Sequence, residues 1–242
     1  EDNVIEAILP IYQDKESLAK SQSPVYIPMR TLNQNLIYLN LDKKSVQSHI
    51  HIGVPGNILD SDKRIRMNAF NKYFGSGMSS IVFQEIREFR SLAYASWGYY
   101  YAPINHQYPA SFEGGLTTQG DKTLEALQVY FNLLDNMPLK PHRMKVLQSS
   151  LMRSISTTYP SFRNVSKVIE TWEYMGYHQD PRILQHKVYQ NMDYREIENF
   201  YIINLKNKNK IVAIVGNKKK FKIKELDKYG VVEIVKLKDL YN

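Results

Sequence analysis

The sequence predicts an α+β fold, a two-layer sandwich in which helices pack on one face of a mostly antiparallel sheet. Strand-like segments occur in pairs along the chain, and groups of helical segments separate the pairs. This order is typical of α+β proteins, because α/β folds alternate single strands with single helices. The 242 residues, 43% of them hydrophobic, are enough to bury one large core.

The strands are predicted from alternating apolar residues and from β-branched content. The second strand is expected to end at Pro55-Gly56, and the third and fourth strands are expected to form a long antiparallel pair. The six predicted strands are Asn35–Leu41, Val46–Val54, Ala93–Ala102, Ala110–Thr118, Ile211–Val215 and Val231–Val235.

Helices are predicted where apolar residues recur at helical spacing. Asp121 is expected to cap the third helix, which stops before Pro138, and Asp193 with Glu196 resembles a capping box. A turn at Gly75-Ser76-Gly77 separates the first two helices. The predicted helices are Asp60–Phe74, Ser79–Phe89, one that begins at Asp121, about 141–158, about 161–175, and Asp193 through Phe200.

One domain accounts for most of the chain. Residues 1–33 are largely polar and aperiodic, so they are expected to form an N-terminal connecting segment, and residues 34–242 a single α+β domain. No apolar run approaches the ~20 residues of a membrane span. The absence of cysteine excludes disulfides and thiolate-bound zinc.

Positive charge is concentrated near the C-terminus. Residues 206–242 hold eleven lysines and four acids, which is +7 of the chain's net charge of +8. This stretch contains no arginine, whereas nucleic-acid binders interleave arginine and stacking aromatic residues with their lysines. We therefore interpret it as a solvated surface and expect no nucleic-acid partner, with a polyanion-binding module as the alternative.

Histidine and carboxylate pairs give no strong signal of catalysis. His49 and His51 share one face of a predicted strand, but no third ligand stands nearby and the zinc-binding helical motifs are absent. Glu85 and Glu88 flank Arg87 on a predicted helix, which favours a charged helix face over an acid–base pair.

A family resemblance gives residues 68–98 a more specific meaning. The stretch NAFNKYFGSGMSSIVFQEIREFRSLAYASWG resembles the signature region of the pitrilysin/insulinase family of zinc metallopeptidases. The shared features are a helix, a Gly-x-Gly turn, a Ser-Ser start, and a Leu-Ala-Tyr step entering a strand. Weaker agreement extends from about Val46 to the strand Ile211–Asn217 and to Leu237–Leu240.

The resemblance implies a non-catalytic unit. The family builds its enzymes from homologous α+β units in two halves that close around a chamber, and one unit carries H-x-x-E-H. The helix from Leu59 to Phe74 has neither histidine nor glutamate. The resemblance therefore implies a C-terminal-half domain with no metal of its own and no activity alone. Zinc is expected on a catalytic partner half, in the same polypeptide or a separate subunit, with a peptide or unfolded protein as substrate.

Arg87 and Tyr94 are the substrate-binding residues that the resemblance implies. They match an arginine and a tyrosine that reach across the chamber towards the zinc in the family's non-catalytic half. A guanidinium fork and a phenol are suitable donors for the negative charge that develops during peptide hydrolysis. The alternative is that Arg87 pairs with a neighbouring carboxylate and Tyr94 merely packs.

Two further expectations remain open. The same fold without a role in proteolysis would make the chain a structural or assembly subunit, as family-like subunits of respiratory complexes are. The family habit favours a bacterial extracytoplasmic location, such as the periplasm.

Overall fold

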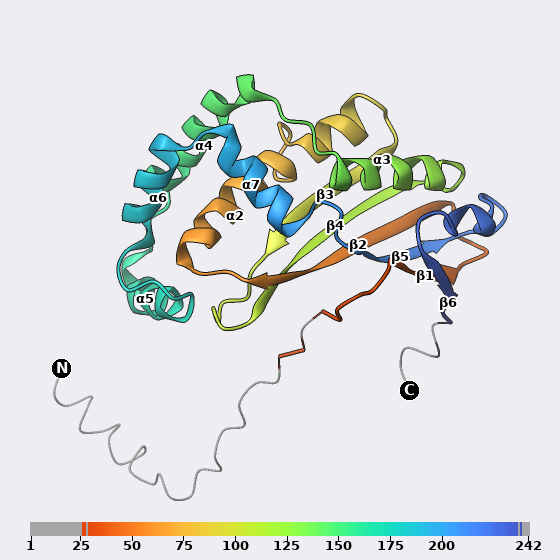
Figure 1. Ribbon diagram of the computed structural model, residues 1–242, viewed down its shortest axis with the longest axis horizontal. Helices are drawn as coiled ribbons and strands as arrows, with labels where there is room; N and C mark the ends of the chain where they lie inside the picture. The colour runs from red at the N-terminus through yellow and green to blue at the C-terminus, as the bar shows by residue number, and fades with distance from the viewer. Residues whose placement is uncertain (1–25, 28, 237, 239–242) are drawn as a thin grey trace, which may run out of the picture.

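A six-stranded sheet with helices over one face forms the body of the protein (Figure 1). The computed structural model describes residues 26–27, 29–236 and 238. The strand order across the sheet is β3-β4-β2-β5-β1-β6. The strands are β1 (Leu36–Leu41), β2 (Gln47–Ile58), β3 (Ala93–Tyr101), β4 (Pro109–Gln119), β5 (Ile211–Gly216) and β6 (Val231–Ile234).

The sheet is mixed, with its antiparallel part on the side that holds β3. The pairs β3–β4, β4–β2 and β2–β5 are antiparallel, while β5–β1 and β1–β6 are parallel. The predicted α+β sandwich is confirmed. The two parallel pairs add a detail that residue alternation does not encode, because alternation reports which face is buried and not which neighbour a strand takes.

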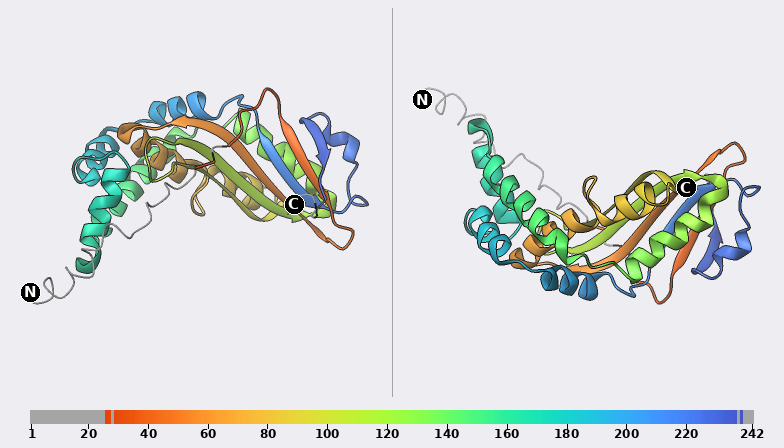
Figure 2. Two further views of the ribbon diagram at one scale, coloured as in Figure 1. Left: turned by 90° about the horizontal axis from the view of Figure 1, so that it is seen from below. Right: turned by 90° about the horizontal axis from the view of Figure 1, so that it is seen from above.

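The helices cover one face of the sheet and leave the other open. Figure 1 shows α3 and α7 above the strands, with α4, α5 and α6 extending past one end. The left view of Figure 2, in which the molecule is seen from below, shows the strands in front. The α-helices are α2 (Ser61–Phe74), α3 (Thr123–Asp135), α4 (Met144–Thr157), α5 (Val165–Tyr174), α6 (Pro181–Asn191) and α7 (Tyr194–Asn204). Shorter turns of 3-10 helix lie at Gly120–Lys122, Pro141–Arg143, Phe162–Asn164 and Ile223–Leu226.

The core lies between the sheet and the helices and is rich in aromatic rings. Phe70 and Phe74 of α2 stack at 5.2 Å between ring centroids, and Phe74 meets Phe112 of β4 edge-on at 5.7 Å. Phe74, Phe112 and Tyr130 are fully buried. These contacts fix α2 and α3 against β3 and β4, the strands that position the candidate site.

Strand β2 continues beyond the predicted stop at Pro55-Gly56. Pro55 pairs with Ser111 of β4, while pairing with β5 on the other side ends at Gly53. A proline is tolerated there because β2 has a partner on only one side at that point. The next position, Gly56, has no room for a side chain, because an added Cβ would lie 1.9 Å from the Tyr100 hydroxyl oxygen.

Of the two helix caps that the sequence predicts, the one at Asp193 is confirmed and the one at Asp121 is wrong. Asp60 accepts a hydrogen bond from the Lys63 amide, and Asp193 accepts from Arg195 and Glu196, so both act as N-caps. Asp121 does not cap α3, because residues 120–122 form a 3-10 turn and the α-helix begins after Lys122. Helix α6, which begins with Pro181 at its first turn, is absent from the sequence prediction.

Two predicted segments fall mostly or wholly outside the described residues. They are the connecting segment 1–33, of which 26–27 and 29–33 are described, and Leu237–Leu240, of which only Lys238 is described. The division into a connecting segment and one domain stays a prediction. Within the described part of the chain, no helix is both long enough and apolar enough to cross a membrane.

Candidate functional site

The segment after α2 forms a turn and then a π-helix. Gly77 has φ +86°, a left-handed conformation that glycine adopts without steric cost. Ser80 caps the next helix: its carbonyl accepts from the Gln84 amide at 3.0 Å, and its hydroxyl accepts from the Phe83 amide at 3.4 Å. A helix is thus present within the predicted range Ser79–Phe89, but it begins at Ile81, and its residues Phe83–Glu88 have π geometry and not α geometry.

The π geometry depends on hydrogen bonds that apolar spacing does not reveal. The Phe89 amide donates to the carbonyl of Gln84, five residues earlier, at 2.9 Å. Ile86 is the only buried residue of this π-helix. π-helices are rare and occur frequently at functional sites. The one here carries Arg87.

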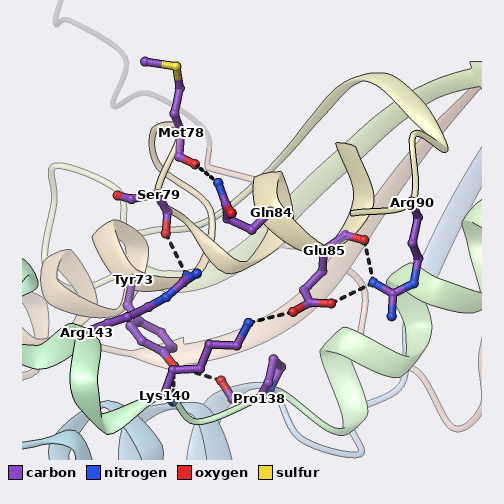
Figure 3. A network of polar contacts seen from close by, with 9 residues as sticks. All are labelled: Tyr73, Met78, Ser79, Gln84, Glu85, Arg90, Pro138, Lys140 and Arg143. Atoms are coloured by element: carbon purple, nitrogen blue, oxygen red, sulfur yellow. Dashed lines mark hydrogen bonds and ion pairs between the residues drawn. The ribbon is translucent and has the colours of Figure 1, made fainter. Parts of the chain in front are cut away.

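A polar network centred on Glu85 connects the π-helix to the chain between α3 and α4 (Figure 3). The Glu85 carboxylate accepts from Lys140 Nζ at 2.8 Å and from Arg90 Nη1 at 2.7 Å. Tyr73 donates its hydroxyl to the carbonyl of Pro138 and accepts from the Lys140 amide, at 2.8 and 2.9 Å. The network thus joins three segments that are far apart in sequence.

Charge is balanced within this network. Burial of the Glu85 carboxyl would raise its pKa, but hydrogen bonds and charge from Lys140 and Arg90 outweigh this and hold the pKa below its ordinary value. Burial raises the pKa of Tyr73. Glu85 is therefore an ionised anchor, with a side chain only 14% exposed.

A β-bulge at the start of β3 displays Tyr94. Ala93 pairs with Thr118 and Ala95 with Thr117, so Tyr94 is the extra residue between two consecutive partners. A bulge of this kind redirects a side chain and is common next to active sites. Tyr94 is 81% exposed although it is a large aromatic residue.

Arg87 and Tyr94 lie together. The guanidinium carbon of Arg87 is 5.8 Å from the centroid of the Tyr94 ring and 4.9 Å from that of Phe83. The nearest carboxylate is that of Glu88, 4.0 Å from Arg87 Nε, and both side chains are about half exposed. Within the described residues, no hydrogen bond engages the Tyr94 hydroxyl, so a phenol and a guanidinium are available side by side.

The other polar candidates take structural roles. His49 Nδ1 lies 3.1 Å from the hydroxyl of Thr117, and His51 meets Trp97 edge-on. Among the described residues, no three His, Cys, Asp or Glu side chains gather as a metal site. This donor set does not fit a zinc ion, and we assign no metal chemistry to this chain's own residues.

Sequence reasoning missed the role of Glu85. It grouped Glu85 with Glu88 as a solvated helix face, whereas Glu85 holds the π-helix in place. No spacing rule reveals this, because its partner Lys140 lies 55 residues away. Trp97 and Tyr99, which stack at 5.2 Å between ring centroids on the open face of the sheet, were also not among the predicted site residues.

Comparison with known proteins identifies the family. The family model for the peptidase M16 inactive domain matches residues 5–141, more than half of the chain. The chain is 41% identical over 59 residues to an uncharacterized zinc protease of Streptomyces coelicolor. The matched region is 24% of this chain and 13% of that protein.

Solved structures share the fold at low sequence identity. A peptidase M16 inactive domain from Pseudomonas fluorescens matches with TM-score 0.60 and 16% identity, over 81% of this chain and 47% of that one. The periplasmic protease PqqL from Escherichia coli matches with TM-score 0.62 and 15% identity, over 90% and 24%. A chain of complex III2 from Candida albicans matches with TM-score 0.54 and 11% identity, over 83% and 50%.

The family match covers the candidate site. The chain spans half or less of the length of each of these proteins. The residues that the family model matches include the turn, the π-helix and the bulge that bring Arg87 and Tyr94 together. The chain therefore belongs to the peptidase M16 inactive-domain family, the non-catalytic domains of the pitrilysin/insulinase zinc metallopeptidases.

Proposed function

We propose that this chain is the substrate-enclosing, non-catalytic domain of a zinc-dependent endopeptidase and that Arg87 and Tyr94 bind substrate opposite a zinc site on another domain. The observation that supports this most is the exposed Arg87–Tyr94 pair. An exposed tyrosine at a bulge beside an exposed arginine on a π-helix adds little to stability, since surface contacts of this kind contribute little. Two backbone irregularities that converge on one pair favour a binding role.

The chemistry suits a peptide substrate. A zinc ion held by the other domain would polarise the scissile carbonyl and its attacking water. The Tyr94 hydroxyl would donate a hydrogen bond to the oxygen on which negative charge develops. The Arg87 guanidinium would hold a neighbouring carbonyl or carboxylate with two N–H groups. Donors fixed before the reaction lower the barrier because they need no reorganisation.

The test is peptide hydrolysis by the protein with its zinc-bearing half present. We expect Tyr94→Phe to lower kcat by about 10²–10³, since that is the usual cost of removing one such donor. Arg87→Lys keeps the charge but loses the fork, so it is expected to lose less activity than Arg87→Gln.

A matched control separates this role from a general effect of removing a phenol. Tyr159 is also exposed, at 71%, and lies between α4 and α5. Tyr159→Phe is expected to leave kcat unchanged. Equal rates for Tyr94→Phe, Arg87→Gln and Tyr159→Phe would contradict the proposed role of the pair.

A second function has one observation in its favour. The fold likeness to a chain of complex III2 is compatible with a structural or assembly subunit that takes no part in proteolysis. In that case, the chain would bind its partner tightly while the Arg87 and Tyr94 variants left every measured activity intact. An extracytoplasmic location belongs to the main proposal, supported by the likeness to a periplasmic protease.

A further inference from the structure

A cavity close to the candidate site is lined in part by Gln84 of the π-helix. It has a volume of about 590 Å³ and lies between the end of α2, the turn after it and the start of α4. Two cationic side chains line it, those of Lys72 and Arg143, and no carboxylate does. Neither Arg87 nor Tyr94 contributes to its wall, so it is distinct from the proposed substrate site.

The surrounding sequence is free of acids. Residues 136–169 contain six lysines and arginines and no aspartate or glutamate, and α4 lies within this stretch. The positive charges of α4 are therefore not neutralised by acidic residues of the same helix. Within the described residues, Lys72 and Arg143 make no ion pair.

Several donors converge on the cavity without partners. Arg143 uses Nη1 on the carbonyl of Ser79 at 3.0 Å, which leaves its other N–H groups available (Figure 3). In the part of the chain that the structure describes, no hydrogen bond engages Lys72 Nζ or the hydroxyls of the lining serines. The lining serines are Ser76, Ser79 and Ser150.

Apolar side chains form the rest of the wall. Met78 and Val146 line the cavity and are 76% and 66% exposed, while Leu147, which also lines it, is buried. The Tyr73 hydroxyl is already engaged on both sides, so only its ring is offered. Apolar surface next to unpaired cations suits a ligand that has both an anionic group and an apolar body.

We propose that this cavity binds a small organic anion, a carboxylate or phosphate on an apolar body, with Lys72 and Arg143 holding the charged group. Met78 and Val146 contact the apolar part. Charge-assisted hydrogen bonds to the anion are stronger than neutral ones, and Arg143 can offer two parallel donors. The site is independent of the proposed proteolytic function.

Titrations with simple probes test this on the whole chain. Hexanoate and hexyl phosphate carry the same apolar body with different anionic groups, and hexanol carries none. We expect dissociation constants on the order of millimolar for the two anions, a range set by their size. Amide NMR signals of Gly77, Gln84 and Val146 should shift with either anion. Whichever of the two binds more tightly identifies the preferred group, and hexanol should bind at least tenfold more weakly.

Variants distinguish this cavity from general attraction to a basic protein. Lys72→Gln and Arg143→Gln are each expected to weaken anion binding about tenfold. The control Lys187→Gln removes an exposed lysine of α6 outside the cavity and should change nothing. Ser150→Asp places a carboxylate in the wall without touching the Arg143–Ser79 bond, so it should abolish binding in a folded protein. Equal binding of hexanol, or equal loss in Lys187→Gln, would overturn the proposal.

Discussion

Among single residues, Glu85 is the one, after Arg87 and Tyr94 themselves, whose contacts matter most for the candidate site. It lies two residues before Arg87 and ties the π-helix to Lys140 and Arg90 by charge-assisted hydrogen bonds. Because its side chain is only 14% exposed, these bonds are less screened by water than a surface pair. The position of Arg87 thus depends on the contacts of a carboxylate two residues earlier in the same helix.

Replacing Glu85 by Gln is expected to lower the free energy of unfolding by about 1–3 kcal/mol, because both charged donors lose their ionised acceptor. Urea unfolding at neutral pH measures this. Glu125→Gln is the control, since its pair with Lys122 is about half exposed on both sides and contributes little to stability because solvent screens it. Similar losses for the two variants would contradict the anchoring role.

The same substitution has a pH dependence whose sign follows from the lowered pKa of Glu85. A carboxyl with a depressed folded pKa contributes stability above its unfolded value, about 4.3, and loses that contribution as the pH falls through the folded pKa. The difference in free energy of unfolding between wild type and Glu85→Gln should therefore be constant from about pH 7 to 5 and shrink below about pH 4. Urea titrations at several pH values check this.

Among elements, the contact of α2 with the edge strand β3 fixes the site's geometry. The Asn71 side chain donates to the Tyr100 carbonyl at 2.8 Å and accepts from the Tyr100 amide at 2.6 Å. It therefore occupies both backbone groups that β3 would offer to an added strand at that point. The end of α2 packs so closely that a Cβ at Gly75 would lie 1.6 Å from the Gly98 carbonyl oxygen.

Substitution by alanine is therefore expected to lower the free energy of unfolding by different amounts at Gly75 and at Gly77. Gly75→Ala forces helix and strand backbones apart and is expected to destabilise by more than about 3 kcal/mol, as overpacking against backbone does. Gly77 has open space around it, so Gly77→Ala carries only the strain of φ +86°, about 1–2 kcal/mol. Chemical unfolding of the two variants should rank them in that order; the reverse ranking would mean that α2 and β3 can separate cheaply.

Sequence patterns predicted most elements because each has a clear period or cap. The apolar face of α2 identifies that helix, and alternation identifies β3 and β4. The failures share a different cause, which is dependence on contacts made later in the chain. Strand β2 passes Pro55 because of its partner β4, and the π-helix is held by Lys140. The bulge at Tyr94 is likewise defined by β4 and not by the residues of β3.

For the whole molecule, the two faces have different characters. One face of the sheet is covered by helices, and the other is open (Figure 2). Trp97 of the open face contacts the rings of both Tyr99 and His51. Tyr26 lies at one end of this sheet, stacked on Tyr108 at 4.3 Å between ring centroids. The candidate pair was predictable from the family resemblance alone. Its geometry was not, because it depends on the bulge and the π-helix together.

The most direct test of the central claim is zinc-dependent peptide hydrolysis by this chain alone and together with a zinc-bearing catalytic half. We expect no cleavage by the chain alone, because no described cluster of its side chains fits a metal. We expect the catalytic half to gain activity when the chain is added, since Arg87 and Tyr94 would then complete the proposed substrate site. Cleavage by the chain alone with zinc, or a catalytic half whose rate is the same without it, would contradict this account.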